Sequence, residues 1–300
     1  MKVLITGACG FIGRNLIKEL EQEHQLRLLD QNRPEEATIF APNTLTGRAP
    51  DPLKTDWPFV QAEITDADAM QAACKDMDAV IHLAGEPRGL PEIGVETFRI
   101  NALGTFVAIN AAHQAGVRRF MCASSINAFG TFYWRLSGKP SPYDRMPIDE
   151  TFPPVPEDPY SLSKLVNEET CAAFHRAYGM TTAAFRFAGV WSQEMYNTRL
   201  AEGLQPTKEW SDDLFQWVHV TDVVSGIRQA LEKSDLPGFG AYTLSAGDTR
   251  CAEPTMELLR TFRPDLSPQI TAPIEGRAPL LSIGLAHRTF DYSPRFRLGS

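Results

Sequence analysis

Tyr160 and Lys164 are the residues of this sequence whose types and spacing most clearly suggest chemistry. They stand four apart in a stretch expected to be helical, so both side chains project from one face. A tyrosine ordinarily ionises near pH 10, and a nearby ammonium lowers that pKa by stabilising the phenolate. Such a pair can remove a proton from a substrate hydroxyl while hydride leaves the same carbon. Ser124 and Ser125, at the end of an upstream apolar run, offer a hydroxyl to align the reacting oxygen.

Gly7, Gly10 and Gly13 lie between the first apolar run and the first amphipathic stretch. Glycine permits a sharp turn and lets a pyrophosphate approach the start of the next helix, where free N–H groups point at it. This position predicts a dinucleotide site. The second apolar run ends in Asp30, whose carboxylate would accept hydrogen bonds from both adenosine ribose hydroxyls and repel a 2′-phosphate. The predicted cofactor is therefore NAD rather than NADP.

The elements that must position these residues alternate over about the first 185 residues. Near-continuous apolar runs predict strands at Val3–Ile5, Leu26–Leu29, Ala79–Leu83, Phe120–Ala123 and Thr181–Phe185. Amphipathic stretches predict helices at Phe11–Glu21, Asp66–Cys74, Glu96–Ala115 and Pro159–Tyr178. This alternation calls for a parallel sheet that is covered by helices on both faces.

Two proline-rich stretches interrupt the alternation. Residues 31–58 hold five prolines and predict an irregular excursion, and residues 131–159 hold seven and predict a long loop after a strand. Long loops at the carboxyl ends of parallel strands build the sites of such sheets. After residue 186 the pattern returns at a helix near Val220–Leu231 and a strand at Ala241–Ser245. We expect a nucleotide-binding domain of residues 1–185 plus 214–246 and a small substrate lobe of residues 186–213 plus 247–300.

Composition narrows the class of protein. The net charge of -8 argues against a nucleic-acid binder, which usually presents a basic surface. The five cysteines form no C-x-x-C pair, which favours a reducing, cytoplasmic setting. The chain has no apolar run of about 18 residues, so no membrane span is expected. The six histidines show no ligand spacing, so no metal site is expected.

Six motifs follow one another in a recognisable order. They are TGACGFIG at Thr6–Gly13, IHLAG at Ile81–Gly85, NALGT at Asn101–Thr105, SS followed by FG over Ser124–Gly130, the pair Tyr160 and Lys164, and WVHVTDVV at Trp217–Val224. Together they resemble the NAD-dependent epimerase/dehydratase branch of the extended short-chain dehydrogenase/reductase superfamily, over nearly the whole chain. The resemblance implies an α/β fold with a doubly wound parallel Rossmann sheet and a small discontinuous C-terminal substrate lobe.

The resemblance also implies roles for particular residues. The catalytic residues would be Ser125, Tyr160 and Lys164, because Ser125 stands at the family's catalytic distance before Phe129-Gly130. The cofactor contacts would be Gly7, Gly10, Phe11, Ile12, Gly13, Asp30, Glu63, Ile64, Leu83, Ala84, Gly85, Asn101, Tyr160 and Lys164. At Glu63 the family has an aspartate. Candidate substrate contacts are Glu86, Arg88, Ser125, Asn127, Trp134 and Arg186.

Two departures from the family pattern bear on the substrate. The family's R-x-x-N-x-x-G-P segment, whose asparagine helps hold a nucleotide-sugar diphosphate, has Gly189 at the asparagine position here. The last part of the chain has few arginines placed to clamp a diphosphate. Arg199, Lys208, Arg250 and Arg277 remain as clamps outside any motif. Both departures resemble uronate dehydrogenases and other members that act on free sugars or sugar acids.

Three functions stay open. The leading one is an NAD-dependent sugar oxidoreductase that epimerises a nucleotide sugar through a transient keto intermediate, and the second is an NAD-dependent dehydrogenase of a free sugar or sugar acid. Ile126-Asn127, where a dehydratase would carry an Asp-Glu pair, argue against dehydration. The third is a non-catalytic NAD-binding module, whose mark would be loss of Tyr160 or Lys164. The expected partner is a small sugar or nucleotide sugar, and family analogy suggests a homodimer built on the helices at 96–115 and 159–178.

Overall fold

The computed structural model describes residues 1–36, 52–131 and 135–299. Its centre is a seven-stranded sheet with the order β3-β2-β1-β4-β5-β6-β9. Neighbouring strands are parallel throughout this sheet. The order reverses between β1 and β4, and ligands of such sheets bind beside the carboxyl ends of the strands at that point. The predicted doubly wound parallel sheet is confirmed.

The strands of the large sheet are β1 (Lys2–Thr6), β2 (Gln25–Asp30), β3 (Phe59–Gln61), β4 (Ala79–His82), β5 (Arg119–Ser125), β6 (Thr181–Phe187) and β9 (Phe239–Leu244). A separate two-stranded sheet pairs β7 (Val190–Trp191) with β8 (Val218–His219). The α-helices of the described residues are α1 (Phe11–Leu20), α2 (Ala67–Cys74), α3 (Gly94–Phe98), α4 (Gly104–Gln114), α5 (Pro159–Tyr178), α6 (Gln193–Glu202), α7 (Val220–Glu232), α8 (Thr255–Phe262) and α9 (Gly284–Phe290).

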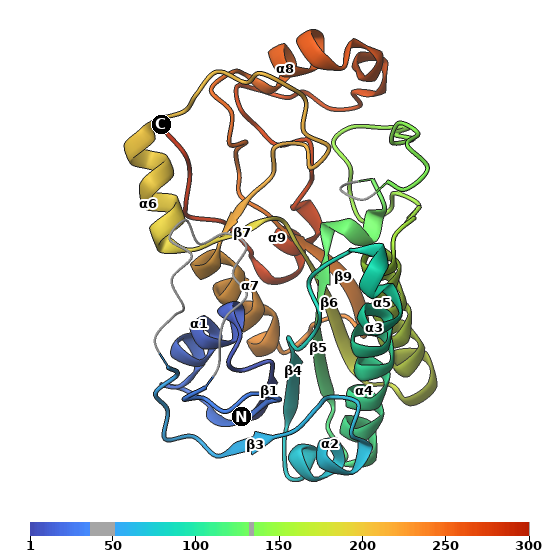
Figure 1. The fold of residues 1–300 in the computed structure, drawn as a ribbon, viewed down its shortest axis with the longest axis vertical. Coiled ribbons are helices and arrows are strands. Elements are labelled where there is room, and N and C mark those ends of the chain that lie inside the picture. The colour runs from blue at the N-terminus through green and yellow to red at the C-terminus, as the bar shows by residue number, and fades with distance from the viewer. Residues whose placement is uncertain (37–51, 132–134, 300) are drawn as a thin grey trace.

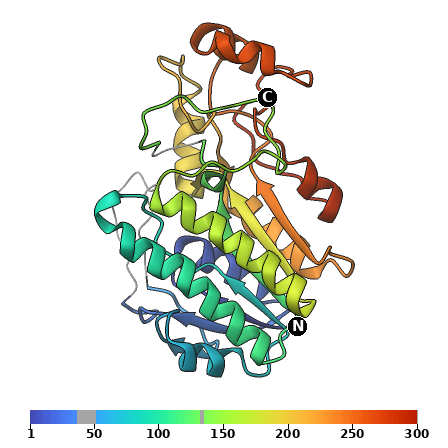
Figure 2. The same ribbon diagram turned by 90° about the vertical axis from the view of Figure 1, so that its right-hand side faces the viewer.

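Helices cover both faces of the sheet, as Figures 1 and 2 show. On one face, α1, α7 and α9 bury apolar side chains such as Leu16, Ile227 and Phe290 against the strands. On the other, α2, α4 and α5 contribute a second cluster that includes Met70 and Ile109. Because both faces are covered, the central strands carry runs of apolar residues, and the last four residues of β1 are all buried.

Helix α5 has strong signals at both ends. The side chain of Asp158 accepts a hydrogen bond from Ser161 N at 2.9 Å, and Pro159 occupies the first helical position. Gly179 ends the helix in the left-handed conformation, at φ 69°. These caps explain why the predicted range Pro159–Tyr178 matches the observed one.

Several elements differ from the expected ones. The helix expected at Glu96–Ala115 begins at Gly94 and is interrupted by a π-helical turn at Arg99–Leu103. Strand β3 was not expected, because it has only three residues and none is buried. Helix α6 was also not expected, since it lacks the apolar periodicity of a packed helix and buries none of its residues. Of the predicted irregular excursion, residues 37–51 lie outside the described part of the chain.

The last part of the chain returns to the sheet. Helix α9 packs on β9 and α7, and the Tyr292 hydroxyl donates to the Ser245 carbonyl at 3.1 Å. The loop before α5 also joins this region, through parallel bridges from Met146 to Ile270 and from Ile148 to Leu281. Part of residues 247–300 therefore lies against the sheet. The proposed division into two domains stays a prediction.

Large apolar side chains are exposed along α3, α4 and α5. Val95 is 88% exposed and Phe106 50% exposed, and Leu162 and Tyr178 of α5 are also exposed. Their location agrees with the helices expected to form a homodimer, which stays a prediction. Within the described residues, no helix has the length and apolar character of a membrane span, and no group of three or more His, Cys, Asp or Glu side chains is arranged to hold a metal.

Candidate active site

The turn from β1 to α1 is built by close backbone contacts. Gly7 has φ 70°, and a Cβ there would lie 2.6 Å from the Ala84 nitrogen. At Gly13 a Cβ would lie 2.3 Å from the Gly7 oxygen. No side chain of the described residues caps α1, whose N-cap is Gly10. The first N–H groups of α1 therefore face the carboxyl edge of the sheet without a side-chain partner, as a pyrophosphate site requires.

Asp30 closes β2 beside this turn and is only 9% exposed. One carboxylate oxygen accepts a hydrogen bond from Cys9 N and the other from Asn32 N, both at 3.0 Å. Burial raises the pKa of Asp30, and these backbone donors lower it again. The carboxylate is held at the expected strand end, and its contact with ribose hydroxyls stays a prediction.

The other expected cofactor residues lie along the same edge of the sheet. Phe11 and Ile12 form the first turn of α1, Leu83, Ala84 and Gly85 follow β4, and Glu63 and Ile64 follow β3. Ile64 is buried against Gly104 of α4, where a Cβ would meet its side chain at 2.6 Å. Glu63 points outward, with its side chain 62% exposed and 3.8 Å from Arg99. These placements are compatible with the expected contacts, which stay predictions.

The three expected catalytic residues come together. Ser125 ends β5, and Tyr160 and Lys164 lie in the first turns of α5. The Ser125 side chain faces the Tyr160 hydroxyl and lowers its pKa. Lys164 Nζ lies 5.5 Å from the centre of the Tyr160 ring and donates to the Ala123 carbonyl at 3.1 Å. Two elements that are distant in sequence thus place a hydroxyl pair beside a buried ammonium.

The expected lowering of the Tyr160 pKa is not found in the protein alone. Burial raises the pKa of Tyr160 to about 12, the Ser125 hydrogen bond lowers it, and the charges of Asp158 and Glu86 raise it. Burial also lowers the pKa of Lys164. The positive charge of Lys164 alone therefore does not offset the cost of burying an ionised Tyr160 side chain.

Asn101, in the π-helical turn, forms side-chain hydrogen bonds that connect the segment after β4 to α5. Its Oδ1 accepts from Glu86 N at 2.7 Å, and its Nδ2 donates to the Glu86 carbonyl and to Ser163 Oγ, both at 3.0 Å. Glu86 in turn accepts from Arg88 Nε at 2.7 Å. Turns of π-helix often mark functional positions, and here the turn fixes the segment after β4 against α5.

The remaining candidate substrate contacts, Asn127, Trp134 and Arg186, differ in where they lie. Asn127 is buried in the turn after Ser125, and its backbone N–H donates to Ser125 Oγ at 3.1 Å. Trp134 lies outside the described residues. Arg186 is 4% exposed and donates to both Glu168 oxygens, at 2.9 and 2.7 Å. A direct contact of Arg186 with substrate would require this ion pair to open.

Glu168 is a residue that the sequence reasoning missed. It accepts from Ser124 Oγ at 2.6 Å as well as from Arg186, and it is 4% exposed. The available signal was its position four residues after Lys164, which places both on the same side of one helix. Its partner Arg186 comes from another strand, and no local pattern predicts that pairing.

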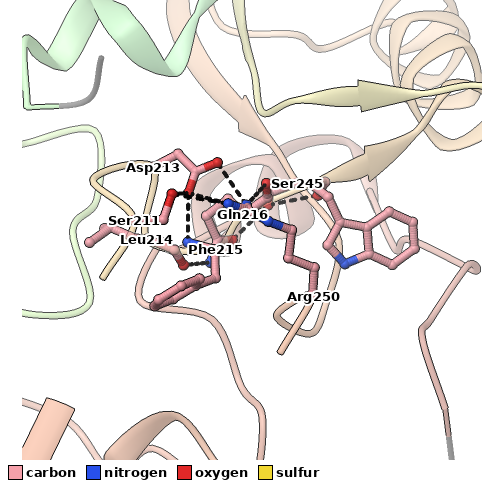
Figure 3. A network of polar contacts seen from close by, with 8 residues as sticks. Ser211, Asp213, Leu214, Phe215, Gln216, Ser245 and Arg250 are labelled. Atoms are coloured by element: carbon pink, nitrogen blue, oxygen red, sulfur yellow. Dashed lines mark hydrogen bonds and ion pairs between the residues drawn. The ribbon is translucent and has the colours of Figure 1, made fainter. Parts of the chain in front are cut away.

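A second buried network lies between the segment 211–217 and the loop after β9 (Figure 3). Arg250 donates to Asp213 at 2.7 Å and to Ser211 at 3.0 Å, and Gln216 accepts from Ser245 at 2.9 Å. Leu214 and Phe215, between them, have left-handed φ of 56° and 58°. A non-glycine residue pays about 1–2 kcal/mol for this conformation, so the network must offset that strain. Its members are Ser211, Asp213, Leu214, Phe215, Gln216, Ser245 and Arg250.

The four cations considered as diphosphate clamps are mostly engaged by carboxylates. Besides the Arg250–Asp213 pair, Arg277 donates to Asp248 at 3.0 Å and Arg199 lies 3.0 Å from Glu202. Lys208 is exposed to solvent. At Gly189 a Cβ would find only an ordinary contact, 3.8 Å from the Gln216 oxygen.

Three known proteins illustrate what the chain is similar to. A putative UDP-glucose 4-epimerase of Methanocaldococcus jannaschii is 30% identical over 64% of this chain, and the alignment spans 56% of that relative's length. An NAD-dependent glucose-6-phosphate dehydrogenase of Haloferax volcanii is 28% identical over 73% of this chain and 76% of its own length. The solved structure of an Agrobacterium tumefaciens short-chain dehydrogenase/reductase superfamily protein with bound NAD superposes with a TM-score of 0.69, at 22% identity, over 99% of this chain and 94% of its own.

The family model of NAD dependent epimerases and dehydratases matches residues 3–244. The match runs from β1 to the end of β9 and so includes the glycine turn, Asp30, Ser125, Tyr160 and Lys164. It confirms the predicted cofactor NAD at the level of the family, and the uncapped start of α1 and the buried Asp30 fit that cofactor. The chain belongs to the NAD dependent epimerase/dehydratase family.

Proposed function

We propose that this protein is an NAD-dependent oxidoreductase of a carbohydrate hydroxyl, with Ser125, Tyr160 and Lys164 as its catalytic residues. The observation that carries the proposal is that Ser125, Tyr160 and Lys164 come together at the same sheet edge as the glycine turn. A non-catalytic NAD-binding module has no need of this arrangement.

In the proposed mechanism, NAD when bound supplies the hydride acceptor. The chain's own residues handle the proton. Ser125 Oγ hydrogen-bonds the substrate oxygen and holds it near Tyr160, whose phenolate oxygen takes the hydroxyl proton. Lys164 donates to the Ala123 carbonyl, and this bond holds its positive charge beside the Tyr160 ring. Since burial raises the Tyr160 pKa to about 12 in the protein alone, we expect proton removal to depend on a filled site.

Two outcomes of that chemistry are proposed for different reasons. Epimerisation of a nucleotide sugar through a keto intermediate is supported by relatives such as the putative UDP-glucose 4-epimerase. In that reaction the hydride returns to the other face of the sugar and the cofactor is retained.

Oxidation of a free sugar or sugar acid, with release of the reduced cofactor, is the second candidate. It is supported by the pairing of Arg250 with Asp213 and of Arg277 with Asp248, and by the missing side chain at Gly189. A diphosphate needs charge-assisted donors along its path, and these two arginines already donate to carboxylates. The contacts of this chain thus favour the dehydrogenase, whereas the relatives include both a putative epimerase and a dehydrogenase.

One pair of measurements separates the two. Denaturing the purified protein and assaying the supernatant should release stoichiometric NAD from an epimerase and little from a dehydrogenase. A thermal-shift panel with NAD present should then compare UDP, GDP and TDP with free uronic acids and aldoses, since a ligand of the folded state raises its stability. Shifts from one nucleoside diphosphate and none from free sugars would remove the dehydrogenase. Absence of turnover with every sugar tested, despite NAD binding, would support the module.

A further inference from the structure

The ends of β5 and β6 and the catalytic helix meet at one buried carboxylate. Ser124 and Arg186 are register partners on neighbouring parallel strands, so both side chains leave the same face of the sheet. That face is covered by α5, from which Glu168 accepts both: Ser124 Oγ at 2.6 Å, and Arg186 Nε and Nη2 at 2.9 and 2.7 Å. The guanidinium also lies 4.1 Å from the centre of the Phe129 ring.

This junction lies immediately behind the catalytic residues. Ser124 precedes Ser125 in the chain, and Glu168 follows Lys164 by one helical turn. The Ser124–Glu168 bond therefore joins β5 to α5 a second time, about two helical turns beyond the contact of Ser125 with Tyr160. A rotation of α5 or a shift of the β5 end would have to break both. We propose that Glu168 is a positioning residue, which holds Ser125 and Lys164 at a fixed spacing by joining α5 to the ends of β5 and β6. The proposal rests on the assignment of these residues as catalytic.

The charges around Lys164 support a second effect of the same residue. Burial lowers the pKa of Lys164, and the groups that raise it again are Cys122 of β5 and Glu168 of α5. From β4, His82 faces the ammonium as a neutral imidazole, since burial lowers its pKa to about 3. Among the described residues, Tyr160 also lies near the ammonium, with its ring centre 5.5 Å from Lys164 Nζ. Glu168 is thus a carboxylate on the same helix that helps keep Lys164 protonated.

Two substitutions separate spacing from charge. Glu168→Gln keeps the size of the side chain and removes its charge. Ser124→Ala removes one hydrogen bond and leaves the Arg186–Glu168 pair in place. The matched control is Asp213→Asn, which breaks another arginine–carboxylate pair, the one between Arg250 and Asp213. It reproduces a loss of stability without touching the catalytic residues.

The test uses the cofactor-free protein, so its result does not depend on knowing the substrate. Lysines labelled with ¹³C at Cε and tyrosines labelled at Cζ are followed by NMR, and the variants Lys164→Ala and Tyr160→Phe assign the two resonances. In Glu168→Gln, the titration of Lys164 should move to lower pH by about one unit. In Ser124→Ala, the Lys164 titration should stay in place while the Tyr160 resonance shifts. Asp213→Asn should change neither.

The activity readout follows with whichever sugar is turned over. We expect kcat to fall about 10- to 100-fold in Glu168→Gln and about tenfold in Ser124→Ala, with KM for the sugar nearly unchanged in Ser124→Ala. If Glu168→Gln does not fold, the positioning role is tested by the Tyr160 resonance of Ser124→Ala, which should shift. Unchanged Lys164 and Tyr160 resonances in folded variants, or the same changes in Asp213→Asn, would overturn the positioning role. If the resonances respond but no sugar is oxidised, the proposed function fails and the junction stands.

Discussion

Two of the regions that contain left-handed backbone adopt it for opposite reasons. In the glycine turn, Thr6–Gly13, it falls on Gly7, a residue that adopts φ 70° without strain. In the segment 211–217 it falls on Leu214 and Phe215, which are held there by Asp213, Gln216 and Arg250. The first shape is encoded locally. The second also depends on Arg250, which is distant in sequence. The part of the chain with most of the expected cofactor contacts (residues 1–125, called the cofactor half) can therefore be interpreted from sequence more readily than the part that includes the expected substrate lobe (residues 181–299, called the substrate half).

The largest expected effect is the loss of turnover on a substitution outside the cofactor half, at Tyr160. Tyr160→Phe removes the proton acceptor, and we expect turnover to fall about 10²- to 10⁴-fold while NAD affinity stays within about twofold. Steady-state kinetics and NAD titration measure the two quantities. Tyr178→Phe, at the exposed end of the same helix, is the control and should change neither. Near-normal turnover in Tyr160→Phe would mean that another base acts.

The next prediction tests whether the glycine turn depends on close backbone contacts that exclude a Cβ. Gly13→Ala places a Cβ 2.3 Å from the Gly7 oxygen, and we expect a loss of about 3 kcal/mol in the free energy of unfolding together with lost NAD binding. Gly189→Ala, in the substrate half, meets only a contact of 3.8 Å and should keep NAD affinity and Tm. Urea unfolding and calorimetric NAD titration compare them. Equal effects at both positions would erase the contrast between the halves.

Acid stability offers one titratable probe in each half. Burial lowers the pKa of His82 from 6.5 to about 3, and burial with the charge of Arg295 lowers that of His219 to about 4. Below pH 6.5 the unfolded imidazoles bind protons that the folded ones do not, so stability should fall as pH falls, by about 1.4 kcal/mol per pH unit and site. The fall should continue to about pH 4 for His219 and to about pH 3 for His82.

The two histidines can be separated by substitution. His82→Gln and His219→Gln should each reduce the slope of unfolding free energy against pH between 6 and 4 by about one proton. Urea unfolding at several pH values measures the slope. A slope that neither substitution changes would place the acid sensitivity in the carboxylates instead.

The smallest effect concerns cofactor choice. NAD should bind at least about tenfold more tightly than NADP, a difference of about 1.4 kcal/mol, because the Asp30 carboxylate repels a 2′-phosphate. Asp30→Ala should reduce this ratio, and Asp68→Ala, on the exposed side of α2, should leave it alone. Equal affinities of the unmodified protein for NAD and NADP would remove Asp30 from this role.

The features predicted from the sequence are those whose information is local. The glycine turn, Asp30 at a strand end, and Tyr160 with Lys164 on a capped helix each depend on residues within one strand, turn or helix. The Ser124–Glu168–Arg186 junction depends on the register of β5 with β6, which no spacing along the chain displays. Helix α6 buries no residue, so it lacks the periodicity that would have predicted it. The pairing of Arg250 with Asp213 joins residues 37 apart.

The chain's last segment has a consequence for its synthesis. Asp222, in the first turn of α7, accepts the backbone N–H groups of Arg295 and Phe296 at 3.1 Å, and Tyr292 packs beside Gly226. Residues 292–296 therefore complete the substrate half. They leave the ribosome some 170 residues after β1 to β5, a delay of roughly 10 to 30 s at ordinary rates of translation. During that interval a nascent chain has the glycine turn and Asp30, the predicted contacts of the dinucleotide. We expect NAD to act on it as a folding ligand before residues 292–296 are synthesised.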